Sequence, residues 1–175
     1  LGLLAGRYLL LTAHRPENVD QKERLRDLVA TVRAVALELK LPVLWPIHPR
    51  TKKQLSQYKI LLPEMITVIE PVGFFEFLQL EESAAMILTD SGGIQEEACV
   101  LRVPCLTLRG NTERPETTSV GGNILVGLSP GKAVRAARKL IARRRNWRNP
   151  FGDGKSGSRM VDILQKSLKN SSRSH

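Results

Sequence analysis

Residues 89–97, Thr-Asp-Ser-Gly-Gly-Ile-Gln-Glu-Glu, combine residue types that bind phosphate at the start of a helix. The paired Gly92 and Gly93 let the backbone approach a ligand closely, and the unpaired N–H groups of the following helix form an anion site. Ser91 adds a hydroxyl donor, and the carboxylate of Glu97 could accept hydrogen bonds from a ribose diol. The same residues would also suit a tight turn with Ser91 as its N-cap, so the nonapeptide alone fits either reading.

Two further loops each place a histidine close to an arginine. Residues 13–18, Ala-His-Arg-Pro-Glu-Asn, hold His14 and Arg15, and residues 46–50, Pro-Ile-His-Pro-Arg, hold His48. Histidine exchanges a proton near neutral pH, and the planar guanidinium of arginine pairs with phosphate. The first loop would equally suit a solvated turn with an Arg–Glu pair, and a histidine beside prolines is also typical of a structural role.

An arginine and three phenylalanines complete the candidate binding residues. Arg114 lies in the segment Asn-Thr-Glu-Arg-Pro-Glu and could clamp a phosphate, although an arginine between two glutamates also suits a surface ion-pair network. Helical spacing puts Phe74, Phe75 and Phe77 mainly in the core, while one of them could stack on a base. Four loops carrying these residue types together favour a phosphorylated ligand as their shared target.

These loops follow apolar segments of strand length that alternate with helical periodicities. Strands are expected at residues 8–12, 43–47, 66–69, 85–89, 104–108 and 123–126. Helices are expected from Leu25 to Leu39 and at residues 52–58, 74–80, 93–101, 132–145 and 159–168, with a polar loop at 13–20. Strands that are apolar on both faces and separated by helices predict a doubly wound α/β domain with a parallel, Rossmann-like sheet. Ligands bind such sheets at the carboxyl ends of the strands, where the candidate residues lie.

The chain is long enough for one such domain. With 175 residues, 42% of them hydrophobic and 25% charged, its composition excludes a disordered tail, a collagen-like fibre and a disulfide-rich miniprotein. No apolar stretch approaches the ~18 residues that would span a bilayer. We expect residues 1–168 to form one domain with C-terminal helices, and the serine-rich residues 169–175 to fray.

The net charge of +10 is concentrated near one end of the sequence. Residues 132–175 hold 13 of the 27 Lys and Arg residues but only Asp153 and Asp162 among the acids. We expect Arg138 and its basic neighbours to form a solvated face, because the chain is only 5% aromatic and has no RNA-binding signature. A polyanion or an acidic partner domain is the alternative. The inward-facing residues of the helix at 132–145 are expected to be Val134, Ala137, Leu140 and Ile141.

Neither cysteine has the neighbours of a metal or redox site. Cys99 and Cys105 lie in apolar surroundings without a CxxC motif or a histidine at ligand spacing, so we expect buried free thiols and no metal. Residues 1–6 lack an initiating Met and a basic segment, and we interpret them as a cut end rather than a signal peptide. Reduced thiols without an export signal predict a cytoplasmic protein.

Five motifs, taken in order, give the sequence a family resemblance. LLTAHRPENVD, IHPRT, TDSGGIQEEA, TERPET and NPFGDGKSGSR resemble the C-terminal half of the non-hydrolysing UDP-N-acetylglucosamine 2-epimerases, from residue 7 to about residue 168. The resemblance implies a cytoplasmic, usually dimeric GT-B enzyme whose active site lies between two Rossmann-like domains. It also implies interconversion of UDP-N-acetylglucosamine and UDP-N-acetylmannosamine for polysaccharide biosynthesis, with no cofactor. In that reaction UDP is eliminated to leave a 2-acetamidoglucal and is then added back.

The resemblance further implies roles for residues around the diphosphate. His14 corresponds to the family's essential histidine, and we expect it to be catalytic. Ser91, Gly92 and Gly93 match the diphosphate-binding turn, and Arg114 matches an arginine that contacts phosphate. Expelling a diphosphate requires stabilisation of developing negative charge, which a helix N-terminus, arginine and histidine supply.

Other residues are expected to contact the rest of the substrate. Glu97 matches the ribose-binding glutamate of the family. Val72 and Phe77 fall at the uracil pocket, Val72 through its backbone. From their loops alone we add Arg15 and His48 to the substrate-binding set.

Two departures from the family pattern shape the expected activity. Pro16 stands where relatives often carry arginine, which alters the charge of the first loop. The N-terminal domain, which in this family supplies the acidic residues that handle the C2 proton, lies outside this sequence. We therefore expect the chain to bind UDP or UDP-sugar weakly and not to epimerise it alone.

Two other classes of function stay open at this stage. The chain could be the donor-binding half of another GT-B enzyme, either a glycosyltransferase or a hydrolysing epimerase. It could also be a non-catalytic binding module whose basic C-terminal helix contacts nucleic acid or a protein partner.

Overall fold

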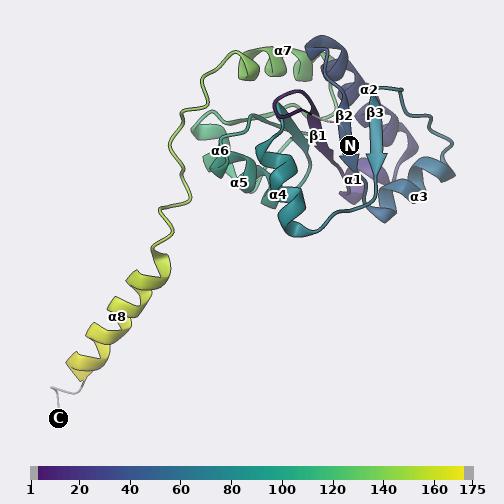
Figure 1. The fold of residues 1–175 in the computed structure, drawn as a ribbon. Coiled ribbons are helices and arrows are strands. Elements are labelled where there is room, and N and C mark those ends of the chain that lie inside the picture. The colour runs from purple at the N-terminus through teal and green to yellow at the C-terminus, as the bar shows by residue number, and fades with distance from the viewer. Residues whose placement is uncertain (1–3, 172–175) are drawn as a thin grey trace.

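The computed structural model describes residues 4–171 and contains one six-stranded sheet (Figure 1). The strand order is β3-β2-β1-β4-β5-β6, and every neighbouring pair is parallel. This is the Rossmann-like order that the alternating apolar pattern predicts. The strands are β1 (Leu9–Thr12), β2 (Val43–Pro46), β3 (Ile66–Ile69), β4 (Met86–Thr89), β5 (Cys105–Thr107) and β6 (Asn123–Leu125).

Helices occupy the connections between these strands. They are α1 (Pro16–Val19), α2 (Lys22–Leu39), α3 (Pro49–Gln57), α4 (Phe74–Glu82), α5 (Gly92–Val100), α6 (Pro115–Ser119), α7 (Pro130–Ile141) and α8 (Ser156–Ser171). Two of them, α1 and α6, lie where no helix was predicted. The segment at 13–20, predicted to be a polar loop, contains the single turn of α1, which begins at Pro16 because proline suits the first helical position.

The side chains of successive strand residues enter two separate apolar cores. Leu9 and Leu11 pack in the larger core with residues of α2 and α7, whereas Leu10 lies in the smaller core on the other face. The smaller core is closed by residues of α4 and α5. Figure 1 shows α2 and α7 along one side of the sheet and α4 and α5 along the other. Burial on both faces explains why the strands are apolar runs rather than alternating patterns.

Helix α7 ends earlier than its pattern predicts. It stops at Ile141 rather than near residue 145, and Ile141 is 40% exposed although it was expected to face inward. Side chains beyond the helix explain the early end. The Arg145 guanidinium donates to the carbonyl of Ala85, and the buried Trp147 indole donates to a carbonyl of α5. These contacts hold the chain after Ile141 against the residue before β4 and against α5.

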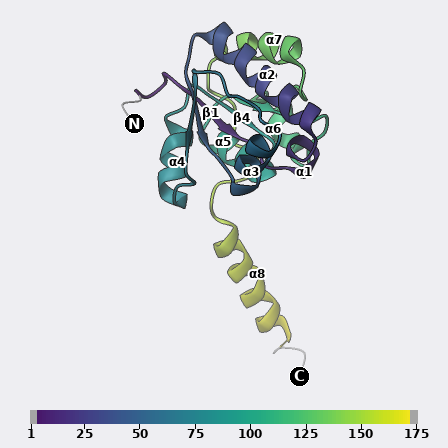
Figure 2. The same ribbon diagram turned by 90° about the vertical axis from the view of Figure 1, so that its right-hand side faces the viewer.

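Helix α8 projects away from the rest of the molecule (Figures 1 and 2). It spans Ser156–Ser171, so it is longer than the predicted helix at 159–168, and residues 169–171 are helical rather than frayed. The remaining residues of the predicted frayed tail, 172–175, lie outside the described part of the chain. Four large apolar side chains of α8 are more than half exposed, namely Met160, Val161, Ile163 and Leu164.

Candidate functional site

The direction in which the chain adds strands to the sheet reverses between β1 and β4, because β2 and β3 lie on one side of β1 and β4 to β6 lie on the other. These two strands are direct neighbours in register, with Thr12 opposite Thr89, and the two threonine hydroxyls lie 2.6 Å apart. In open α/β sheets the crevice outside the carboxyl ends of such a strand pair is the usual ligand site. The loops that begin at His14 and Ser91 leave the sheet at this point.

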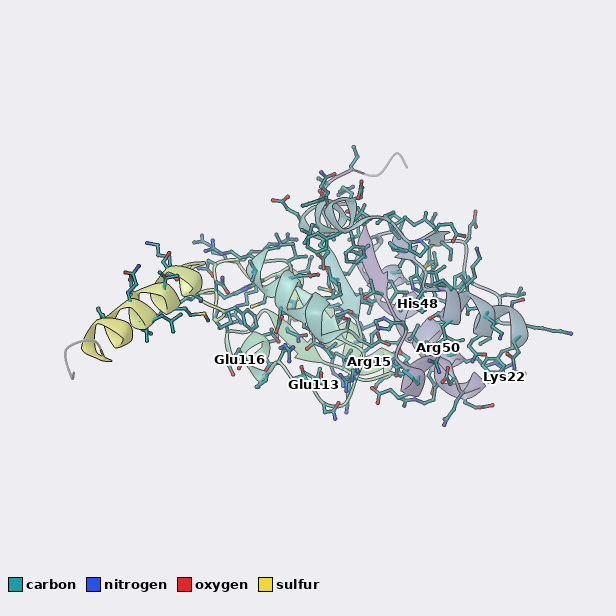
Figure 3. All side chains as sticks on the ribbon, turned by 90° about the horizontal axis from the view of Figure 1, so that it is seen from below. Arg15, Lys22, His48, Arg50, Glu113 and Glu116 are labelled. Carbon is teal, nitrogen blue, oxygen red and sulfur yellow. The ribbon has the colours of Figure 1, made fainter. Side chains whose placement is uncertain are left out.

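A hollow of about 210 Å³ opens beside these strand ends. Five of the predicted site residues border it, although they come from five different segments of the chain: His14, His48, Val72, Phe77 and Ser91. The other lining residues are Thr12, Pro46, Pro71 and Ile94. Figure 3 views the molecule from this end of the strands, with Arg15, His48 and Glu113 labelled.

The two histidines of the hollow lie close together. Their ring centroids are 5.6 Å apart, and the planes are tilted by 31°. His48 is the N-cap of α3, where its Nδ1 accepts a hydrogen bond of 3.1 Å from the backbone N–H of Arg50. That acceptor role leaves the proton on Nε2 of a neutral His48. The side chain of His14 is 41% exposed, so it is open to a ligand or solvent.

Asp90 fixes the backbone of the loop that carries His14. It is completely buried, and its carboxylate accepts hydrogen bonds from the backbone N–H groups of His14 and Arg15, at 3.1 and 3.0 Å. The side-chain amide of Asn18 donates to the same carboxylate at 3.1 Å. The His14 Nδ1 lies 3.6 Å from Asp90 Oδ1. Asp90 was not among the predicted site residues, although a charged residue at the end of a buried apolar strand is the signal that could have singled it out.

Helix α5 begins beside the hollow, with Gly92 buried and Gly93 exposed in its first turn. Ser91 is the N-cap but makes no side-chain capping hydrogen bond. Gly92 and Gly93 have no positive φ, and a Cβ on either would come no closer than 3.5 Å to its neighbours. Neither the backbone nor the packing therefore requires glycine, although glycine costs about 0.8–1 kcal/mol relative to alanine inside a helix. The turn geometry therefore does not account for the pair.

The two predicted phosphate-binding arginines form ion pairs. Arg15 Nη2 lies 3.7 Å from Glu113 Oε2, and Arg114, the N-cap of α6, pairs with Glu96 of α5. The surface ion-pair network kept as an alternative for Arg114 is therefore present. An anionic ligand would have to compete with Glu96 for this guanidinium.

Arg109 is a third arginine at this end of the sheet, and the sequence analysis missed it. Its side chain is only 8% exposed, and it pairs with Glu17 at 2.8 Å and with Glu113 at 3.4 Å. It therefore joins the loop after β1 to the loop after β5. Its position just beyond an apolar strand is the signal that could have identified it.

Glu97 does not border the hollow at the strand ends. It lies one helical turn beyond Ile94, and it borders a second hollow of about 440 Å³. The other residues around this second hollow are Leu78, Glu96, Val100, Leu101 and Phe151. Because residues three apart share a helix face, Glu97 and Ile94 both face α4.

The described residues contain no group of three or more His, Cys, Asp or Glu arranged to hold a metal ion. Cys99 and Cys105 are buried free thiols, as the sequence predicts. Burial raises the pKa of the Cys105 thiol well above its ordinary value, which makes it a poor nucleophile. Within residues 4–171, no helix combines the length and apolar composition needed to cross a bilayer.

Comparison with known proteins identifies close relatives of this chain. A family model described as UDP-N-acetylglucosamine 2-epimerase matches residues 2–165. The UDP-N-acetylglucosamine 2-epimerase of Methanocaldococcus jannaschii is 53% identical over 161 residues, which cover 90% of this chain and 44% of the relative. The enzyme of that name from Methanococcus maripaludis is 48% identical over 162 residues, which cover 90% of this chain and 44% of that relative.

A solved structure of the M. jannaschii enzyme supports the same likeness. The crystal structure in complex with UDP-GlcNAc and UDP superposes with a TM-score of 0.84 at 53% identity, covering 91% of this chain and 45% of that one. The chain therefore spans about half the length of the curated relatives it matches.

Proposed function

Because this chain belongs to the UDP-N-acetylglucosamine 2-epimerase family, we propose that it is the nucleotide-binding half of such an enzyme. The reaction is the interconversion of UDP-N-acetylglucosamine and UDP-N-acetylmannosamine through elimination and re-addition of UDP. The observation that carries the proposal is the hollow at the reversal of the sheet, which His14, His48 and Ser91 border beside the N-terminus of α5.

The diphosphate is proposed to bind at the start of α5. The unpaired N–H groups there carry a partial positive charge, and Gly92 and Gly93 leave the backbone open to phosphate oxygens. The free hydroxyl of Ser91 can donate a further hydrogen bond. Arg15 and Arg114 lie in the neighbouring loops, and each would exchange its present glutamate partner for a phosphate oxygen.

His14 is proposed to assist departure of the diphosphate. When the bond between C1 of the sugar and UDP breaks, the bonding electrons leave with the β-phosphate oxygen. A hydrogen bond from His14 stabilises that charge, and the buried Asp90 carboxylate, 3.6 Å from the His14 Nδ1, helps to hold the imidazole in place. The C2 proton is taken by a base outside this chain, leaving the 2-acetamidoglucal, and is returned to the opposite face when UDP adds back.

The nucleoside is proposed to occupy the apolar part of the hollow and the space toward α4. Phe77 and the backbone at Val72 provide a uracil-sized surface, with His48 at the rim. The Glu97 carboxylate would accept hydrogen bonds from the ribose hydroxyls. This assignment needs the ribose to reach one helical turn along α5, a rise of about 5.4 Å.

The rest of the enzyme is proposed to be a second domain facing this site. Residues 1–168 then form the UDP-binding Rossmann-like domain of a GT-B pair, and the exposed apolar face of α8 packs on the other domain. We propose that the complete enzyme is a homodimer and acts in the cytoplasm, in keeping with the free thiols of Cys99 and Cys105.

Calorimetric titration of the purified chain with UDP tests the binding half of the proposal. We expect a single site for UDP and much weaker binding of uridine, because the diphosphate supplies the contacts at α5. Binding of uridine and UDP with equal affinity, or no heat with UDP, would contradict the proposal. A second titration with duplex DNA, at low and moderate salt, addresses the basic-module alternative, which predicts strong salt-dependent binding.

A further inference from the structure

Glu81 is a completely buried carboxyl group on the inner face of α4. It lies at the side of the smaller core that contains Ala84, Ala98 and Cys105. Neither of its carboxylate oxygens accepts a hydrogen bond from a donor in the described part of the chain. A bare carboxylate in such surroundings would carry a large desolvation cost, so the group must keep its proton or share it with a neighbour.

The neighbour is Glu97 on the facing helix α5. The pKa of each carboxyl group is raised, chiefly by burial, and the negative charge of Glu97 raises that of Glu81 further. Glu81 is completely buried and Glu97 only partly, so Glu81 is the member of the pair that keeps the proton and Glu97 is its acceptor. Burial and the negative charge of Glu97 together raise the pKa of Glu81 to about 8, so at neutral pH the pair holds one proton and one negative charge.

The other groups near the pair do not neutralise it. Glu96 on α5 is negative and raises the pKa of Glu97, although its own carboxylate is paired with Arg114. Cys105 on β5 is a neutral thiol. On the remaining neighbours, the Tyr8 hydroxyl and the Arg145 guanidinium donate to the backbone carbonyls of Leu80 and Ala85 rather than to the carboxyl pair.

The pair lies one helical turn behind the wall of the hollow. Phe77 precedes Glu81 by four residues on α4, and Ile94 precedes Glu97 by three on α5, so each carboxyl shares a helix face with a lining residue. A change in the contact between Glu81 and Glu97 would therefore move the carboxylate that the proposed function assigns to the ribose.

We propose that Glu81 is a positioning residue for nucleotide binding, which holds the Glu97 carboxylate in place by donating the shared proton to it. The inference rests on the proposed function of Glu97. While Glu81 is protonated, one Glu97 oxygen is held and the other faces the ribose hydroxyls. When Glu81 ionises, two carboxylates face each other, Glu97 turns away, and the ribose loses its acceptor.

The test is calorimetric titration with UDP between pH 6.5 and pH 9. For the unaltered chain we expect affinity to fall about tenfold over this range, since the hydrogen bonds lost involve a charged acceptor. Glu81→Gln keeps a donor that does not titrate, so its affinity should vary much less with pH. Glu82→Gln, an exposed neighbour on the same helix, serves as the matched control and should behave like the unaltered chain. Identical pH profiles for the unaltered chain and Glu81→Gln would overturn the proposal.

Two further experiments distinguish failure of this inference from failure of the proposed function. A 2′,3′-dideoxy analogue of UDP should bind with little dependence on Glu81, because it lacks the hydroxyls that Glu97 accepts. Carboxyl NMR of the unliganded chain should show Glu81 and Glu97 titrating together, with one step near pH 8 that disappears in Glu81→Gln. Absence of that step overturns the inference even if UDP binds, whereas its presence without UDP binding overturns the assigned function alone.

Discussion

The carboxylate of Asp90 shows how a single residue prepares the site. Its three N–H partners belong to the loop after β1, and they lie 72 to 76 residues away in the sequence. Strand pairing brings them together, because β1 and β4 are neighbours and end at the same edge. The loop that carries His14 is thereby held in one conformation before any ligand arrives.

Replacing Asp90 with asparagine is expected to lower stability sharply. An asparagine can keep its oxygen at the position of Oδ2, but its NH₂ group would then face the His14 N–H, which lies 3.2 Å from Oδ1, and the remaining hydrogen bonds would lose their charged acceptor. We expect a loss of about 2–3 kcal/mol in the free energy of unfolding, measured by urea denaturation. Asp27→Asn, on the exposed side of α2, should change it by less than about 0.5 kcal/mol. Equal effects of the two substitutions would show that the Asp90 contacts contribute little.

A substitution at Gly93 separates binding from stability. Gly93→Ala meets nothing closer than 3.9 Å, so it should stabilise α5 by about 0.5–1 kcal/mol. The added methyl group lies where the diphosphate is proposed to approach, and UDP affinity should therefore fall about tenfold, the cost of one hydrogen bond to a charged group. Gly131→Ala, in the first turn of α7, is the matched control. It should stabilise the fold to a similar degree and leave calorimetric UDP binding unchanged.

At the scale of the elements, the sequence predicts the strands better than the helix ends. Buried parallel strands are apolar runs, and all six occur within a residue or two of their expected places. The end of α7 is decided by Arg145 and Trp147, whose partners lie on other elements. The apolar periodicity of the α7 sequence cannot reveal partners that lie on other elements.

The same distinction separates the site residues that could be predicted from those that could not. His14, His48 and Ser91 each follow a predicted strand, so parallel topology alone brings them to one edge. Glu81 was missed because the predicted helix ended at residue 80, and its burial depends on how α4 packs against α5. Pairings between distant elements require the folded structure.

The interface between α4 and α5 is expected to make stability fall as pH rises. The pKa of Glu81 is about 8 in the folded chain and about 4.5 when unfolded, so the folded state holds its proton more tightly. This contribution is full below pH 4.5 and is lost progressively toward pH 8. Between pH 5.5 and pH 8 we expect a loss of about 3 kcal/mol, which Glu81→Gln should abolish. Urea denaturation at both pH values provides the measurement, and a loss that persists in Glu81→Gln would assign it to other groups.

At the scale of the whole molecule, the basic C-terminal segment is partly used within the fold. Arg138 forms an ion pair with Glu38 across α7 and α2, and Arg143 donates to the carbonyls of Val120 and Gly121. Because Arg138, Arg143 and Arg145 already have partners within the fold, fewer basic side chains can reach a polyanion than the charge of the segment suggests. A solvated face with structural arginines describes it better than a nucleic-acid surface, which would need cations free to reach phosphates.

The chain alone is expected to bind UDP without epimerising UDP-N-acetylglucosamine. The chain contains the proposed diphosphate site and His14, while the base for the C2 proton is proposed to lie on a second domain. Proton NMR of UDP-N-acetylglucosamine incubated with the chain should show no UDP-N-acetylmannosamine. Turnover by the purified chain would mean that one of its own residues removes the C2 proton.

The apolar face of α8 is expected to matter only in the presence of the proposed second domain. Ile163 is 66% exposed, so Ile163→Asp should change the thermal stability of the isolated chain very little. In a chimera with the N-terminal half of the M. jannaschii relative, the same substitution would bury an unpaired charge between the domains and should remove most of the epimerase activity. Gln165→Asp, on the same helix, adds the same charge at a polar position and should be tolerated in both settings. If Ile163→Asp destabilised the isolated chain, α8 would be packed on its own domain. Retention of activity in the chimera would instead show that the partner of this helix lies outside the active enzyme.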